Sequence, residues 1–131
     1  MSQSRQLAAI MFTDIVGYTA LMGNDEQKAF AILSKNRDLQ KPFIEQFNGK
    51  WIKELGDGVM ASFNTVSDAV NAAIKIQEAC NAAKDFKLRI GIHLGEVVFE
   101  NDDALLYFSI RLIVSCISFS LIIINHVKLF M

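Results

Sequence analysis

The sequence predicts an α+β fold in which two helices cover one face of a largely antiparallel sheet. Short apolar runs of strand length alternate with two longer segments that have helical periodicity, and two of the runs flank a Gly-Asp-Gly turn. No internal repeat or low-complexity linker interrupts this order. With 131 residues, the chain is long enough for one domain with one core.

The first two elements are a strand and a helix. Residues 7–16 (LAAIMFTDIV) are a short apolar run ended by a glycine, which is typical of a strand buried on both faces. Residues 24–47 have apolar positions at helical spacing, with Asn24 as the expected N-cap and Gly49 as the expected stop. Pro42 predicts that this helix is kinked or split.

A hairpin and a second helix follow. Residues 50–55 and 59–63 are two short strand-like runs, and the Gly-Asp-Gly sequence between them folds such runs into a hairpin. Residues 66–83 carry small apolar side chains at three- and four-residue steps, which predicts a helix. Thr65, with an acidic residue three positions later, is the expected cap.

The last predicted elements are two strands, residues 88–93 and 96–99, separated by Gly95. The complete order is strand, helix, hairpin, helix and strand pair. This order predicts a ferredoxin-like α/β sandwich.

Composition excludes several function classes. The net charge of -1 and the absence of a Lys/Arg cluster argue against a nucleic-acid partner. Cys80 and Cys116 lack the spacing of a zinc site or a disulfide framework, so we expect free thiols in a reducing compartment. The polar N-terminus has no secretory layout, and we therefore expect a cytoplasmic location.

The composition changes abruptly near residue 103. All 14 acidic residues lie at or before Asp103, whereas residues 104–131 contain only Arg111 and Lys128 as fixed charges. We therefore expect two parts of different character: a domain over residues 1–103 and an apolar tail over residues 104–131.

Two carboxylates are the first candidate functional residues. Asp14 interrupts an apolar strand, where it needs a cation or hydrogen-bond donors, or else caps the following turn through the amides of Val16 or Gly17. Asp57 lies at the hairpin tip, where most aspartates only form the turn. In a ferredoxin-like sheet the first strand lies beside the hairpin, so the two carboxylates could converge in an arrangement that suits two magnesium ions.

Three segments in this order resemble the class III adenylyl and guanylyl cyclase family: FTDIVGYT at 12–19, KELGDGVMASF at 53–63 and LRIGIHLGEV at 88–97. The resemblance covers residues 1 to about 103. It implies a palm-like catalytic domain, incomplete at its C-terminus, that converts ATP to 3',5'-cyclic AMP and pyrophosphate in intracellular signalling.

The resemblance also implies the metal site. Asp14 and Asp57, assisted by the carbonyl of Ile15, would bind two Mg²⁺ or Mn²⁺ ions. One ion would lower the pKa of the ribose 3'-hydroxyl, and the other would neutralise charge on the departing pyrophosphate.

Nucleotide-binding residues are implied in the same way. The backbone amides expected to hold the triphosphate belong to Val16, Gly17, Tyr18 and Thr19. Arg89 resembles the family's phosphate-contacting arginine, and Lys53 matches the adenine-selecting lysine where guanylyl cyclases usually carry Glu. Asp103 stands near the family's second adenine-selecting residue.

The residues themselves also permit simpler interpretations. On strand pattern alone, Lys53 is better interpreted as a solubilising charge on an edge strand, and Glu54 points to the opposite face. His93 is interpreted as a structural residue at a strand end, because no second His or Cys lies at metal-ligand spacing.

The resemblance ends after Asp103. The family's Asp-x-aromatic-Gly and Asn-x-x-x-Arg patterns are missing from residues 104–131, and Arg111 lies among apolar neighbours that do not match. The resemblance implies that the chain forms a homodimer or pairs with a partner cyclase subunit. The main hypothesis for its function is an adenylate cyclase. The alternative is a catalytically impaired cyclase that binds only nucleotide or a partner. A diguanylate cyclase is remote, because GDGVM is not its GG[DE]EF turn.

Two explanations of the tail remain open. Residues 105–124 have the length of a membrane span, although Arg111 and the serines weaken that interpretation. Alternatively, the reading frame changes near codon 104, which the abrupt loss of every family feature favours.

Overall fold

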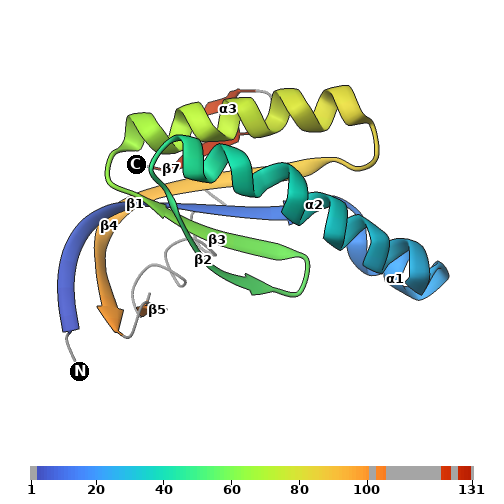
Figure 1. Ribbon diagram of the computed structural model, residues 1–131, viewed down its shortest axis with the longest axis horizontal. Helices are drawn as coiled ribbons and strands as arrows, with labels where there is room; N and C mark the ends of the chain where they lie inside the picture. The colour runs from blue at the N-terminus through green and yellow to red at the C-terminus, as the bar shows by residue number, and fades with distance from the viewer. Residues whose placement is uncertain (1–2, 101–102, 106–121, 125–126, 131) are drawn as a thin grey trace.

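The fold is built on four antiparallel strands in the order β2-β3-β1-β4. They span β1 Gln3–Ile15, β2 Lys50–Leu55, β3 Gly58–Phe63 and β4 Leu88–Glu100. Helices α2 (Glu26–Gln46) and α3 (Val66–Ala83) lie side by side on one face of this sheet (Figure 1). The predicted ferredoxin-like α+β sandwich is confirmed.

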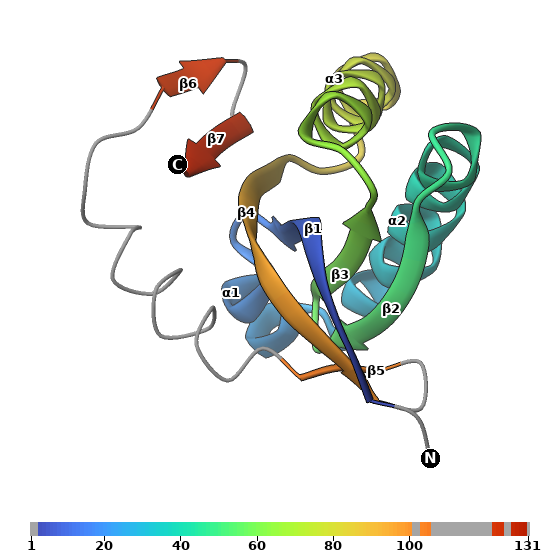
Figure 2. The ribbon, with the colours of Figure 1, turned by 90° about the vertical axis from the view of Figure 1, so that its left-hand side faces the viewer.

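The computed structural model describes residues 3–100, 103–105, 122–124 and 127–130, and the side chains of residues 7–95. Three further strands extend the sheet past β4 (Figure 2). Two of them, β5 (Asp103–Leu105) and β7 (Val127–Phe130), pair with β4, and β6 (Ile122–Ile124) pairs with β7. The apolar tail therefore adds strands to the sheet. Most of the predicted span at 105–124 lies outside the described residues, among which no helix is long and apolar enough to cross a bilayer.

The main core lies between the sheet and the two helices. Met11 and Ile15 of β1 point into it, together with Ala61 of β3 and Ile90 of β4. Because strand side chains alternate, the residues between them face away from the helices. A smaller apolar cluster forms there, with Ala8, Ile10 and Met60 buried and Phe12 and Ile52 packed against it.

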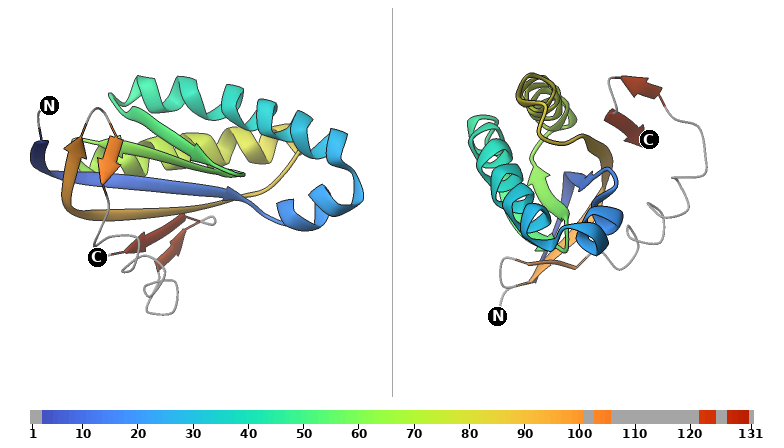
Figure 3. Two further views of the ribbon diagram at one scale, coloured as in Figure 1. Left: turned by 90° about the horizontal axis from the view of Figure 1, so that it is seen from below. Right: turned by 90° about the vertical axis from the view of Figure 1, so that its right-hand side faces the viewer.

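The predicted helix at residues 24–47 is confirmed as α2. A short helix that was not predicted, α1 (Tyr18–Asn24), precedes it beyond the end of the sheet (Figure 3). Asp25, rather than Asn24, caps α2 by accepting a hydrogen bond from the amide of Lys28. Asn24 is the last residue of α1, so the cap position falls on the next residue and α2 begins later than predicted.

Pro42 does not split α2, which continues from Glu26 to Gln46. Proline removes one helical hydrogen bond, to the carbonyl four residues earlier at Asp38. Both Pro42 and Asp38 lie on the exposed side of the helix, where water can hydrate that carbonyl. The expected break therefore does not occur.

The helix ends just before the predicted Asn48-Gly49 stop, but the left-handed residue is not the one expected. Asn48, rather than Gly49, has the left-handed backbone, with φ of 59°. A Cβ on Gly49 would lie 2.5 Å from Cε1 of Phe63 and 2.9 Å from Cγ2 of Ile44. Glycine is therefore needed at position 49 because the backbone passes close to the core.

The hairpin is confirmed, with Leu55 paired to Gly58 around a two-residue turn. Thr65 caps α3 as predicted, accepting a hydrogen bond from the amide of Asp68 at 3.1 Å. The predicted strand pair at 88–99 is wrong, because β4 is a single strand of 13 residues. Continuous pairing with β1, in which Gly95 lies opposite Ala8, keeps the backbone extended through the glycine.

Candidate functional site

The candidate site lies at one end of the sheet, next to α1. The C-terminal end of β1, the first residues of β4 and the β2–β3 turn meet there (Figure 1). Thr13 pairs with Val59 near the turn, and Asp14 pairs with Arg89 of β4. Antiparallel pairing thus brings three chain segments that are distant in sequence to one place.

Asp14 and Arg89 form a two-point ion pair across β1 and β4. The guanidinium donates from Nε to Oδ1 at 2.7 Å and from a terminal nitrogen to Oδ2 at 3.1 Å. Both side chains are about half exposed, at 58% for Arg89 and 44% for Asp14. The Asp14 carboxylate is therefore satisfied by a cation, and the alternative interpretation as a turn cap is not what the structure shows.

Asp57 is tied to the same strand. Its Oδ2 accepts a hydrogen bond of 2.9 Å from the backbone amide of Ile15, the residue after Asp14. The pKa of Arg89 is raised above its ordinary value, first by the hydrogen bond and the charge of Asp14 and further by the charge of Asp57. The two predicted carboxylates therefore lie at the same end of β1, where Asp14 binds Arg89 and Asp57 binds the amide of Ile15.

These groups match the donor chemistry of a hard divalent cation. Carboxylate and carbonyl oxygens are the ligands that Mg²⁺ and Mn²⁺ prefer, and the site offers two carboxylates beside the Ile15 backbone. No cluster of three or more His, Cys, Asp or Glu side chains occurs in the described part of the chain. The site thus fits a metal that takes its remaining ligands from a bound phosphate and from water.

The turn between β1 and α1 is the predicted phosphate loop. Gly17 has a left-handed backbone with φ of 75°, which turns the chain from the strand into α1. The amide of Val16 donates to the carbonyl of Lys87 at 2.9 Å. The amides of Gly17, Tyr18 and Thr19 follow at the start of the helix.

Lys53 lies on the same face of the sheet as Asp14. It pairs with Met60, which belongs to the apolar cluster on the face away from the helices. Glu54 lies opposite Val59 and turns toward the helices, where it contacts Arg37 of α2. The predicted opposite orientation of Lys53 and Glu54 is confirmed.

His93 faces the same side as Lys53, because it pairs with Ile10 of the small apolar cluster. Partial burial lowers the pKa of its imidazole. The side chain of Asp103 and all of Arg111 lie outside the described parts.

Sequence reasoning missed a set of polar residues behind the site. Asn36 and Gln40 of α2 are 2% and 0% exposed, and Gln40 hydrogen-bonds both Asn36 and Thr13. The signal was present, since two amides four residues apart interrupt the apolar face of a helix. Only the fold shows that Gln40 contacts Thr13, the residue before Asp14.

Known proteins resemble the chain in sequence and in structure. The sequence model of the adenylate and guanylate cyclase catalytic domain matches residues 1–105. A protein named "Putative adenylate cyclase 3" from Rhizobium meliloti (strain 1021) is 34% identical over 107 residues, which are 76% of this chain. The match spans only 18% of that relative's length.

Two solved structures show the same fold. The adenylate/guanylate cyclase/hydrolase from Silicibacter pomeroyi is 33% identical, with a TM-score of 0.71 over 79% of this chain and 65% of that one. A bacterial light-regulated adenylyl cyclase has a TM-score of 0.79 at 16% identity, over 98% of this chain and 44% of that one. The second similarity extends over nearly the whole chain and concerns the fold alone.

Proposed function

Because the chain belongs to the adenylate and guanylate cyclase catalytic domain family, we propose that it acts on ATP, forming 3',5'-cyclic AMP and pyrophosphate. The observation that carries this proposal is the convergence of Asp14, Asp57 and Arg89 at the end of the sheet that also presents Lys53. Two acidic ligands, a phosphate-binding cation and a base-contacting lysine are the groups that this reaction needs.

Asp14 and Asp57 would hold two Mg²⁺ or Mn²⁺ ions with the carbonyl of Ile15. When bound, the ions supply acidification of the ribose 3'-hydroxyl and neutralisation of the charge on pyrophosphate. Asp57 is held in place for this role by the Ile15 amide. Asp14 becomes available when Arg89 turns from the carboxylate to a phosphate.

Arg89 and the β1–α1 turn would bind the triphosphate. Arg89 is about half exposed and already contacts the Asp14 carboxylate, so a side-chain rotation would let it reach a phosphate held near Asp14. The amides of Gly17, Tyr18 and Thr19 would donate to phosphate oxygens. Val16 contributes differently, since its amide secures the turn to Lys87.

Lys53 would select the base. Its ammonium group can donate to an acceptor on the adenine ring, whereas guanine presents donors at the corresponding edge. ATP is therefore the proposed substrate in preference to GTP. Asp103, at the start of β5, is proposed as the second adenine contact.

We propose a homodimer, or a pair with another cyclase subunit, as the working form, in which one subunit supplies the carboxylates and the other supplies Lys53.

One sequence observation favours a second candidate function. No Asn-x-x-x-Arg pattern occurs between residues 104 and 131. Positioned donors of that kind stabilise charge in the transition state, so a chain without them binds nucleotide but turns it over poorly.

Calorimetry with a non-cyclisable ATP analogue and Mn²⁺ tests the proposal. The natural chain should bind the metal-nucleotide, and Asp57→Asn should weaken binding by about tenfold or more, since it removes a charge next to the metal. Asparagine keeps an oxygen that can accept from the Ile15 amide, so the turn is preserved. Equal affinity in the two proteins would show that the metal assignment is wrong.

A further inference from the structure

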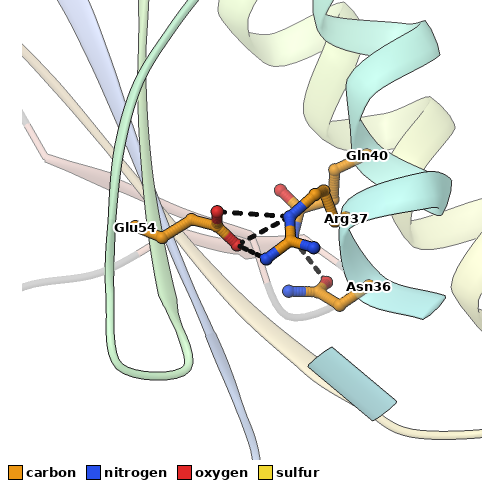
Figure 4. Close-up of polar contacts among 4 residues, drawn as sticks. All are labelled: Asn36, Arg37, Gln40 and Glu54. Atoms are coloured by element: carbon orange, nitrogen blue, oxygen red, sulfur yellow. Dashed lines mark hydrogen bonds and ion pairs between the residues drawn. The ribbon is translucent and has the colours of Figure 1, made fainter. Parts of the chain in front are cut away.

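Helix α2 contacts β2, the strand that carries the proposed base-contacting residue Lys53, through Arg37 as well as through Lys41, whose ammonium lies 5.2 Å from the centre of the Trp51 ring. Arg37 reaches across to Glu54 of β2, with its Nε 3.2 Å from both carboxylate oxygens and a terminal nitrogen 3.0 Å from Oε1 (Figure 4). The hydrogen bond and the charge of Glu54 raise the pKa of Arg37. A guanidinium that contacts both oxygens of a carboxylate fixes orientation as well as distance.

The strand that receives this contact is irregular at the residue before Lys53. Trp51 pairs with Ala61 and Lys53 pairs with Met60, so Ile52 is an extra residue in β2. A bulge of this kind breaks the ladder locally and changes the direction of the following side chains. The direction of Lys53 is therefore set less firmly by the strand pairing than that of a residue in a regular strand.

Glu54 is the first residue after Lys53, and adjacent residues of a strand point to opposite faces. When Arg37 holds Glu54 on the helix side, Lys53 is directed to the other face, where Met60 lies. The side-chain exposures of 41% for Arg37 and 33% for Glu54 show that the pair lies at the rim of the helix layer and is not part of the core.

The helix side of this contact is rigid. Asn36 precedes Arg37 and is 2% exposed, and its Oδ1 accepts a hydrogen bond of 2.6 Å from Gln40 (Figure 4). Gln40 is itself bound to Thr13 of β1 at 3.0 Å. Arg37 therefore projects from a helical turn that is hydrogen-bonded to β1 at Thr13, the residue before Asp14.

We propose that Arg37 is a positioning residue for base recognition, which acts through Glu54 to hold Lys53 on the nucleotide side of the sheet. This inference depends on the proposed function, because it assumes that Lys53 contacts the base. It adds that the choice between ATP and GTP depends on the Arg37–Glu54 ion pair, which lies on the helix-covered face of the sheet, opposite Lys53.

The test compares the affinities for a fluorescent ATP analogue and the matching GTP analogue in the presence of Mn²⁺. Arg37→Ala and Glu54→Ala should each lower the preference for ATP by about two- to fivefold, the range expected from losing one exposed ion pair. The reversed pair, Arg37→Glu with Glu54→Arg, should restore the preference. A residue with only a structural role would change both affinities equally.

Lys35→Ala is the matched control. Lys35 also lies on α2 and forms an exposed ion pair, with Asp85 at 3.3 Å, but that pair does not involve β2. Its removal should leave the ATP preference unchanged. Amide hydrogen exchange, measured without nucleotide, should be faster at residues 52–55 in Arg37→Ala and normal in Lys35→Ala.

The outcomes separate the two proposals. If the natural chain prefers ATP and Arg37→Ala and Glu54→Ala keep that preference, the positioning role is wrong and the proposed function stands. If the natural chain binds neither nucleotide, or binds both equally, base selection by Lys53 is wrong and the positioning role fails with it.

Discussion

Arg89 of β4 contacts both oxygens of the Asp14 carboxylate, at 2.7 and 3.1 Å. The proposed metal ligand and the proposed phosphate ligand are thus bound to each other. Because the guanidinium and a metal compete for the same carboxylate, the two proposed roles are coupled.

Removing this competitor should strengthen metal binding without nucleotide. Arg89→Ala should bind Mn²⁺ about two- to fivefold more tightly than the natural chain, which electron paramagnetic resonance of free Mn²⁺ measures. Arg37→Ala is the control, since Arg37 also contacts both oxygens of a carboxylate but lies on the other face of the sheet. Unchanged or weaker Mn²⁺ binding by Arg89→Ala would contradict the competition.

A charge change at the base contact should alter nucleotide preference. Lys53→Glu should lower the ATP:GTP affinity ratio by about tenfold, because a carboxylate can accept hydrogen bonds from the N–H groups of guanine. Lys50→Glu is the control, because Lys50 lies on the same strand and pairs with Ser62. Parallel changes in the two variants would mean that net charge, rather than base contact, controls the preference.

Turnover should depend on the sequence after Asp103. The natural chain with Mn²⁺ should form cyclic AMP about four to six orders of magnitude more slowly than a chimera that carries a complete family C-terminus, since two transition-state donors are missing from residues 104–131. Direct assay of cyclic AMP in the two proteins measures this. Comparable rates would show that the chain is a working cyclase as it stands.

The buried amide of Gln40 should matter for stability. Gln40→Leu should lower the free energy of unfolding by about 1–3 kcal/mol, because it leaves the buried groups of Thr13 and Asn36 without their partner. Urea unfolding measures the loss. Gln46→Leu, a change on the exposed side of the same helix, should stay within about 0.5 kcal/mol. Equal effects would indicate that the network contributes nothing.

Acidification should destabilise the fold through His93. Burial lowers the pKa of its imidazole below the ordinary value of 6.5, so the unfolded chain takes up its proton at a higher pH than the folded chain does. Stability from the neutral side chain is present above pH 6.5 and is lost as pH falls toward the folded pKa. His93→Gln should flatten the decline of the thermal midpoint between about pH 7 and 5. An unchanged slope would contradict the contribution of His93.

The sequence alone determined the order of the main elements from β1 to β4, but not α1 or the strands after β4. Turn chemistry and helical periodicity are local, so the Gly-Asp-Gly hairpin and the Thr65 cap could be predicted from neighbouring residues. Local rules failed where context decides. Pro42 is tolerated because its neighbouring carbonyl faces water, and β4 stays continuous because β1 pairs with it along its full length.

The same division holds for the candidate site. Local sequence identified Asp14 and Asp57 by residue type and position, whereas Arg89 and Lys53 were assigned through the resemblance to the cyclase family, whose motifs are contiguous. Only the tertiary structure decided which groups meet, since Asp14 and Arg89 are 75 residues apart and the Gln40 contact joins a helix to a strand 27 residues away. Strand register and helix packing set those contacts, and both arise from burial of the whole sheet face, which no short segment specifies.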